Sequence, residues 1–239
     1  KYEDYPIGYF MDPAVQFVYE PGSVFKPMTM AAGIDSGAIT PETTYFDSGS
    51  VTLNGKTITN WDKKAYGKAT MMNVIEHSIN TGAVFAEQKT GNKVFYEYLR
   101  KFGFGEKTQI DLPDEVTGSL KNLEKKDWRA IDFANAAFGQ GSSVTPIQLI
   151  TAFSSIANGG LLMRPYINSE IKPYVVRRVI SPETAEKVTK MMESAVEKAQ
   201  VATISQYRVA GKTGTAQIPE NGVYTEQYIH SYVGFAPAS

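Results

Sequence analysis

The sequence predicts a mixed α/β (α+β) fold, and three patterns in its 239 residues carry that prediction. Apolar residues recur at helical spacing in several segments, and capping residues such as Thr145 and Ser181, each followed by proline, mark helix starts. Asn54-Gly55 lies between short alternating stretches, as in a β-hairpin. The chain closes on β-like stretches at 207–217 and 229–236. No repeat or linker divides it, so we expect a single domain over residues 1–239.

The pattern places each element in chain order. Helices are expected to begin at the following residues: Ser23, Thr70, Thr81, Asn92, Thr145 and Ser181. The first helix tolerates Pro27 because amides of a first turn have no intrahelical partner to lose. Residues 103–140 are expected to be rich in loops, and Ile150 is expected to face inward from the helix that follows. A turn near Asn221-Gly222 should join the closing strands.

The composition excludes several classes of protein. The formal net charge of −1 gives no electrostatic reason to bind nucleic acid. The absence of cysteine excludes a disulfide framework and a thiol nucleophile. No apolar run reaches the ~18 residues that would span a bilayer. No His/Asp/Glu cluster has the spacing of metal ligands, so we expect neither a metal nor another cofactor.

The first chemical motif pairs Ser23 with Lys26. A bare Ser-x-x-Lys arises by chance roughly once in a chain of this length, and Ser169 with Lys172 also matches. On the helix expected at Ser23, a spacing of three places both side chains on one face. The copy at Ser169 lies in a β-like segment, where the same spacing places them on opposite faces. The spacing therefore favours Ser23 and Lys26.

The second motif is Lys212-Thr213-Gly214-Thr215, in a β-rich stretch. The similar Lys89-Thr90-Gly91 fits the end of a helix, with a basic last turn and a glycine cap. A phosphate-binding loop would need glycine five positions before Gly211, where Gln206 stands. Nucleotide binding is therefore disfavoured.

The third motif, Ser78-Ile79-Asn80, would in isolation be taken as a helix cap. It gains weight because it lies between the other two motifs in the chain. His77 and His230 have no Gly-x-Ser-x-Gly turn to serve, so a structural role is predicted for both.

These residue types suit acyl transfer through a serine nucleophile. Ser23 needs a base to take its proton, and Lys26 can act only when neutral. Free lysine titrates near 10.4, so Lys26 would need its pKa lowered by roughly 3 units, or about 4 kcal/mol. Lys212 is the candidate second cation that would help to lower it. Ser78 could relay a proton, and Asn80 could hold Lys26 or a substrate amide.

The same segments offer an oxyanion site. The backbone amides of Ser23 and Thr215 could converge on one oxygen, each worth about 2.7–4 kcal/mol by analogy with other oxyanion sites. Gly214 would let a substrate backbone approach as an added strand. Thr213 and Thr215 offer hydroxyls to a carboxylate.

The order Ser-x-x-Lys, Ser-x-Asn, Lys-Thr-Gly resembles that of the penicillin-recognising serine enzymes. Class B (monofunctional) penicillin-binding proteins are the most similar group, on the following segments: Tyr19–Pro27, Phe138–Gly141, Val144–Gln148 and Val209–Gln217. The resemblance runs from about Ala14 to Ala236. It implies the penicillin-binding/serine β-lactamase-like transpeptidase fold, an antiparallel sheet covered by helices plus an all-α lobe.

The resemblance also implies an activity, a D,D-transpeptidase that cross-links peptidoglycan stem peptides of the D-Ala-D-Ala type and is acylated by β-lactams. It makes Ser23 the nucleophile and Lys26 its base. It makes Ser78 and Asn80 the second family motif and 212–215 the third. It further implies cell-wall synthesis partners and a place on the extracytoplasmic face of the bacterial membrane, with an anchor outside this sequence.

The family usually begins this domain with a strand pair and ends it with a further strand and helix. We therefore expect terminal sheet strands to be missing and the domain to be truncated at both ends. Two alternatives stay open. A serine β-lactamase is disfavoured because no Glu-x-x-Leu-Asn segment is present and Tyr66-Gly67-Lys68 lacks the asparagine of the class D motif. A non-enzymatic β-lactam sensor would be acylated once and then signal.

Overall fold

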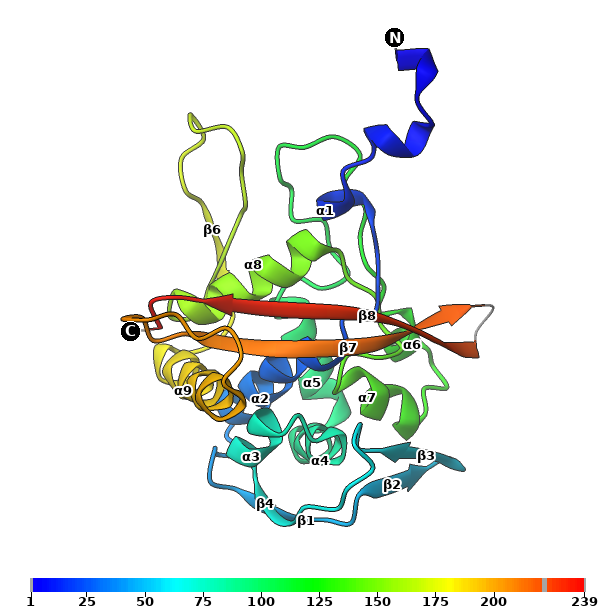
Figure 1. Cartoon of the computed structure of the whole chain (residues 1–239), viewed down its shortest axis with the longest axis vertical. Helices are drawn as coiled ribbons and strands as arrows, with labels where there is room; N and C mark the ends of the chain where they lie inside the picture. The colour runs from blue at the N-terminus through cyan, green and yellow to red at the C-terminus, as the bar shows by residue number, and fades with distance from the viewer. Residues whose placement is uncertain (1, 221–222, 239) are drawn as a thin grey trace.

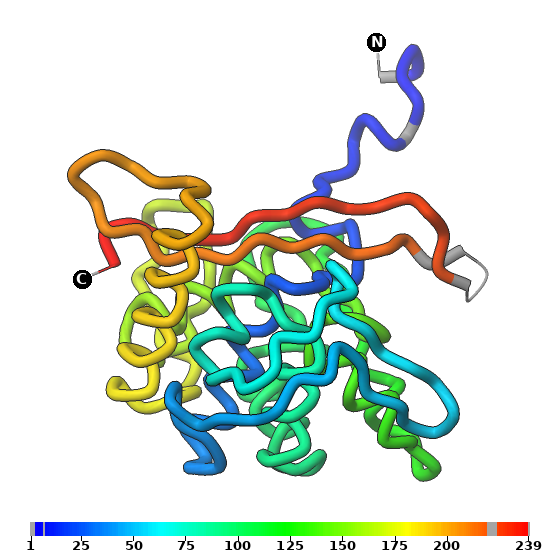
Figure 2. The backbone as a smooth tube through the Cα atoms, turned by 60° about the horizontal axis from the view of Figure 1, so that its bottom comes forward, coloured from blue at the N-terminus to red at the C-terminus, as the bar shows by residue number. Residues whose placement is uncertain are grey.

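A long β-hairpin lies across a group of helices in the computed structural model, which describes residues 2–220 and 223–238 (Figure 1). Its strands are β7 (Ala210–Glu220) and β8 (Val223–Phe235), paired antiparallel. Figure 2 shows the hairpin running along one side of the helical group, with the N-terminal segment crossing beside it. The predicted turn at 221–222 lies outside the described residues.

The helix α2 (Lys26–Asp35) forms the centre of the molecule. All of its residues from Lys26 to Ile34 are buried. Its most extensive contacts with other helices are those with the following: α4 (Asn80–Thr90), α5 (Asn92–Lys101) and α9 (Pro182–Ala199). Since α9 also packs against β7, the hairpin and the central helix share one hydrophobic core.

The predicted helix caps are present. Thr70 accepts a hydrogen bond from Asn73 N at the start of α3 (Met71–Glu76), and Thr145 accepts one from Gln148 N at the start of α8 (Pro146–Ala157). Ser181 caps α9 in the same way. These starts confirm the sequence prediction.

Three short antiparallel pairs surround the helices. They are β1 (Thr44–Asp47) with β4 (Gly67–Thr70), β2 (Ser50–Leu53) with β3 (Lys56–Thr59), and β5 (Leu161–Met163) with β6 (Val175–Arg178). The predicted Asn54-Gly55 turn joins β2 to β3, with φ of 48° and 72°. Positive φ at both central residues is what a type I′ hairpin requires.

The remaining elements are short. They are η1 (Tyr2–Asp4), η2 (Ile7–Phe10), α1 (Pro13–Gln16), η3 (Gly22–Phe25), α6 (Lys121–Glu124) and α7 (Ala130–Ala136). Among the described residues, no helix has both the length and the apolar character needed to cross a membrane.

Some local predictions were wrong. The α-helix expected at Ser23 begins at Lys26, because residues 22–25 form the 3-10 turn η3. Ile150 is 45% exposed instead of facing inward, because the buried stripe of α8 runs through Leu149 and Phe153. The stretch 103–140 is rich in loops, as predicted, and also contains α6 and α7. Ser169 lies in a turn between β5 and β6, not in a strand.

Candidate active site

Lys26 is the first residue of α2 and its side chain is fully buried. Its Nζ donates hydrogen bonds to Ser78 O at 2.6 Å, Ser78 Oγ at 3.2 Å and Asn80 Oδ1 at 2.8 Å. These three acceptors can take all three protons of an ammonium group. The first and second motifs, 52 to 54 residues apart, therefore meet at one amine.

Lys212 reaches the same place from the hairpin. It lies on β7, is 4% exposed, and donates from Nζ to Ser78 Oγ at 2.9 Å and Thr213 O at 3.0 Å. The Ser78 hydroxyl is thus within hydrogen-bond distance of both amines. The convergence expected from the sequence is present for Lys26, Ser78, Asn80 and Lys212.

Burial makes both amines easier to deprotonate. Removal of water lowers the pKa of Lys26 well below its usual value, and the positive charge of Lys212 lowers it further. Burial alone lowers the pKa of Lys212 to about 8. The direction agrees with the need for a neutral amine at position 26.

Ser23 lies in η3, one turn before Lys26, and its carbonyl accepts the Lys26 backbone N–H. Of the hydrogen bonds formed by the described residues, none joins Ser23 Oγ to Lys26 Nζ. In free enzymes such contacts are often long and shorten when substrate binds. Ser23 is half-buried and is therefore partly accessible from solvent.

The hairpin packs directly on the segment that holds Ser23. A Cβ at Gly22, where φ is +61°, would lie 2.8 Å from Thr215 O. The Thr215 carbonyl therefore faces η3 and not β8. Since the N–H and C=O of one strand residue point to the same side, the Thr215 amide also faces η3. This orientation is the one that an oxyanion site shared with the Ser23 amide requires.

Gly214 has a packing reason to be glycine. A Cβ there would lie 2.6 Å from Ser231 Oγ, 2.8 Å from Val24 Cγ1 and 3.1 Å from Pro21 O. The close approach that excludes a side chain is therefore made by Ser231 of β8 together with the protein's own 21–24 segment. The approach of a substrate strand expected at Gly214 stays a prediction.

The Phe138–Gly141 segment supports the first motif from the other side. Gly139 has φ of +80°, and Gly22 N donates to Gly139 O at 2.9 Å. A Cβ at Gly139 would collide with the Gly22 backbone. Glu20 accepts from Gly141 N at 3.0 Å and from the Tyr224 hydroxyl at 3.0 Å, which ties β8 to the same segment.

Ser78 has a left-handed backbone, with φ of +56°. Such a conformation is uncommon for a residue other than glycine and costs of order 1 kcal/mol. Ile79, not Ser78, is the residue that precedes α4 as its cap position. The capping interpretation of Ser78 is therefore wrong, and its strained backbone presents both its carbonyl and its hydroxyl to Lys26.

A buried carboxylate behind the second motif was not found from the sequence. Asp47 is 1% exposed. It accepts hydrogen bonds from Gly49 N at 2.9 Å, Asn60 Nδ2 at 2.8 Å, Tyr66 N at 2.9 Å and Thr81 Oγ1 at 2.6 Å. Neither hydrophobic periodicity nor motif spacing marks such a residue. The four donors that offset the cost of burying its carboxylate come together only after folding.

Asn60 links this carboxylate to α4. Its Oδ1 accepts from Asn80 N at 3.1 Å and Thr81 N at 3.2 Å, which caps a helix that has no side-chain cap of its own. Asn80 Nδ2 donates to Thr59 O at 2.9 Å, so that Asn80 Oδ1 is left to face Lys26. The 59–60 segment thus fixes the orientation of Asn80.

We expect Asn60→Ala to slow acylation by a β-lactam about tenfold to a hundredfold, because Asn80 and Lys26 lose their alignment. It should also lower the free energy of unfolding by about 1–3 kcal/mol, since the buried Asp47 loses a donor. Stopped-flow acylation and thermal unfolding measure the two effects. Asn158→Ala, which removes an exposed bond to Leu161 O, is the control. An unchanged acylation rate in Asn60→Ala would show that the 59–60 segment does not position Asn80.

The competing motif copies lie apart from this site. Ser169 and Lys172 are exposed. Lys89 lies 5.5 Å over the ring of Phe85 at the end of α4, and Gly91 caps that helix as predicted. His77 stacks on Tyr66 with ring centroids 5.2 Å apart, in line with a structural role.

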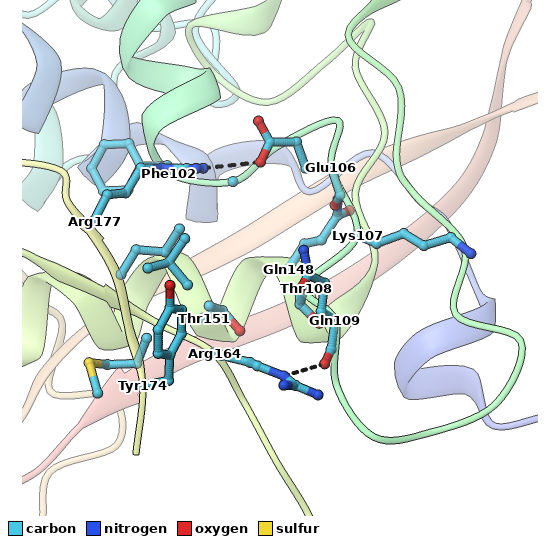
Figure 3. Close-up of a pocket in the computed structure, with 14 residues that line it drawn as sticks. Phe102, Glu106, Lys107, Thr108, Gln109, Gln148, Thr151, Arg164, Tyr174 and Arg177 are labelled. Atoms are coloured by element: carbon cyan, nitrogen blue, oxygen red, sulfur yellow. Dashed lines mark hydrogen bonds and ion pairs between the residues drawn. The ribbon is translucent and has the colours of Figure 1, made fainter. Parts of the chain in front are cut away.

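A cavity of about 170 Å³ lies between the end of α5, α8 and the β5–β6 pair (Figure 3). Of the described residues that line it, none belongs to the three motifs. Arg177 pairs with Glu106 at 3.3 Å, and Arg164 donates to Gln109 O at 2.6 Å. Because these charged groups are already paired within the protein, we assign the cavity no part in the site. Within 2–220 and 223–238, no group of three or more His, Asp or Glu side chains is arranged to hold a metal.

A serine at the entry of a buried helix, with two lysines around a second serine, defines a serine–lysine site on an α/β fold. Residues 2–239 match the family model described as penicillin binding protein transpeptidase domain. The chain belongs to this family, and the predicted resemblance is confirmed.

Particular relatives agree. Stage V sporulation protein D of Bacillus subtilis (strain 168) is 38% identical over 249 residues, which cover 98% of this chain and 38% of that protein. The apo transpeptidase domain of Burkholderia pseudomallei penicillin-binding protein 3 superposes with a TM-score of 0.87 at 32% identity, covering 96% of this chain and 70% of that one. Penicillin-binding protein 3 of Mycobacterium tuberculosis, complexed with aztreonam, superposes with a TM-score of 0.84 at 30% sequence identity. The match covers 98% of this chain and 58% of that one. The predicted fold class is confirmed.

Proposed function

We propose that this domain is a D,D-transpeptidase that cross-links peptidoglycan stem peptides through an acyl-enzyme on Ser23. One observation carries the proposal: the Ser78 hydroxyl lies between the buried amines of Lys26 and Lys212, beside the turn that holds Ser23. Family membership supports the reaction class, and the aztreonam complex of a relative supports acylation by β-lactams.

In the first half-reaction, neutral Lys26 takes the hydroxyl proton of Ser23, and Oγ attacks the carbonyl carbon of the penultimate D-Ala. The amides of Ser23 and Thr215 stabilise the negative oxygen. The tetrahedral intermediate collapses as the C–N bond breaks. The leaving amine receives a proton through Ser78 from Lys26, and an ester to Ser23 remains.

In the second half-reaction, the amine of another stem peptide attacks this ester. Lys26 accepts the proton of the incoming amine and Ser23 regains its own, so that a new amide forms and the serine is restored. Lys212 stays protonated, where its charge keeps Lys26 neutral. Thr213 and Thr215 donate to the terminal carboxylate of the donor peptide.

The chain spans 38% of the sporulation protein's length, so the activity of the whole protein is part of this proposal. We place the domain on the extracytoplasmic side of the bacterial membrane, where its substrate lies, among other cell-wall synthesis proteins. We also propose that residues 1–239 act as one domain, because a single hydrophobic core extends from Val24 to Ala210.

The test combines a labelled penicillin with a transpeptidation assay. We expect a stable covalent adduct, and transfer of a D-Ala-D-Ala stem peptide to an added amine acceptor, each lost in Ser23→Ala. Turnover of penicillin within seconds would instead identify a β-lactamase. A stable adduct without peptide transfer would identify a sensor.

A further inference from the structure

His230 lies beside the third motif, although the sequence predicted only a structural role for it. It pairs with Thr215 across the β7–β8 hairpin, and its Nδ1 is 3.2 Å from Thr215 Oγ1. The Thr215 carbonyl faces away from β8, so Thr215 and His230 form a non-hydrogen-bonded pair, in which side chains come closest. Both side chains are exposed on the face that also carries Thr213.

The contact decides what the Thr215 hydroxyl can do, because that group has one proton to donate. When Nδ1 carries no proton, it accepts the Thr215 proton, and the hydroxyl cannot donate to a substrate. When Nδ1 is protonated, it donates to Thr215 Oγ1 and leaves the hydroxyl proton free. A positively charged imidazole always donates from Nδ1 and adds a charge that attracts an anion.

We propose that His230 is a positioning residue for recognition of the donor carboxylate. Its protonated Nδ1 donates to Thr215 Oγ1, so that the Thr215 hydroxyl proton points toward the substrate carboxylate. This inference rests on the proposed function. The preferred ligand would carry an ionised carboxylate within hydrogen-bond distance of the Thr213 and Thr215 hydroxyls. Recognition should also strengthen as the imidazole gains a proton.

The groups around His230 leave its charge free to act. On its own strand, the ring of Tyr228 lies 6.3 Å away between centroids, and Tyr232 shares its face two residues further on. Opposite, β7 presents uncharged threonines, while the amine of Lys212 is buried and bonds to Ser78. Glu226 is the one acidic residue of β8 within four residues of His230, and it lies beyond Tyr228, where the register with β7 shifts.

The experiment compares benzylpenicillin, which has a carboxylate, with its neutral methyl ester. The measured quantity is the ratio of their acylation rate constants between pH 5.5 and 7.0, a range in which Lys212, with a pKa of about 8, keeps its proton. The ratio cancels the titration of Lys26, because both ligands need the same base. In the wild type, we expect the ratio to rise about fivefold as pH falls, the scale of one favourable charge interaction at a partly exposed site.

Two variants separate positioning from structure. His230→Asn keeps a polar atom near the Nδ1 position but cannot become charged, so the ratio should stay flat with pH. His230→Lys restores a charge and should raise the ratio at every pH in the range. A pH-dependent ratio retained in His230→Asn would overturn the proposal, as would a flat ratio in the wild type. Failure of the transpeptidase proposal shows separately, as absent adduct or absent peptide transfer with either ligand.

Discussion

We expect Ser23→Ala to form no covalent adduct with a fluorescent penicillin, a loss of at least about a thousandfold in acylation rate. The change removes the hydroxyl that lies one turn before Lys26 and leaves the 3-10 turn intact, since alanine fits its backbone. Labelling on a denaturing gel, with a melting curve to confirm folding, measures the effect.

The chain supplies a matched control for this variant. Ser169 also precedes a lysine by three residues, but it lies exposed in the turn between β5 and β6. Ser169→Ala should therefore label like the wild type. Labelling retained in Ser23→Ala, or lost in Ser169→Ala, would move the nucleophile away from Ser23.

The second large effect is expected for Lys26→Met, which should reduce acylation by about a hundredfold to ten-thousandfold, the range of a lost general base. The variant should still fold. Because burial lowers the pKa of Lys26, the unfolded chain binds more protons than the folded one between that lowered pKa and the ordinary lysine pKa. Wild-type stability therefore rises with pH, and the buried amine is a cost at neutral pH.

Methionine removes that cost but leaves Ser78 O and Asn80 Oδ1 without their donor. We expect the two effects to offset each other, with a melting temperature within about 5 °C of the wild type. The dependence of the acylation rate on pH checks the role of Lys26 as the general base. Wild-type acylation should rise through the lowered pKa of Lys26 and fall as Lys212 loses its proton near pH 8.

Lys26→Met should lose the rising limb of this profile. Lys89→Met, in the duplicate Lys-Thr-Gly at the end of α4, should keep both limbs. A rising limb that persists without Lys26 would assign the base to another group.

The sequence predicted the helices well because their starts carry local chemistry. Thr145 and Ser181 cap helices with their own side chains, and Asn54-Gly55 forms a turn through its own backbone. The strand β8 was predicted to begin at 229 but begins at Val223. The part that was missed lacks a regular alternation of burial, because residues 226–228 are all exposed.

The site was predicted where its residues lie within short motifs. Each motif could be found because its own residues lie within a few positions of one another. The structure then brings together Lys26, Ser78, Asn80 and Lys212 from the three motifs. The direction of the Thr215 amide and the left-handed backbone of Ser78 depend on neighbours distant in the chain.

The supporting residues could not be predicted for the same reason. Asp47 and Asn60 act through hydrogen bonds to segments up to 34 residues away. His230 meets Thr215 only because the register of β7 and β8 pairs them. Patterns within a window of sequence contain no information about such contacts.

The most direct measurement is tandem mass spectrometry of the wild-type protein after reaction with benzylpenicillin and proteolysis. The account predicts one acyl group per chain, located on Ser23 in the peptide that contains Pro21 to Lys26. An acyl group on Ser78, on Ser169 or on any other residue would contradict it.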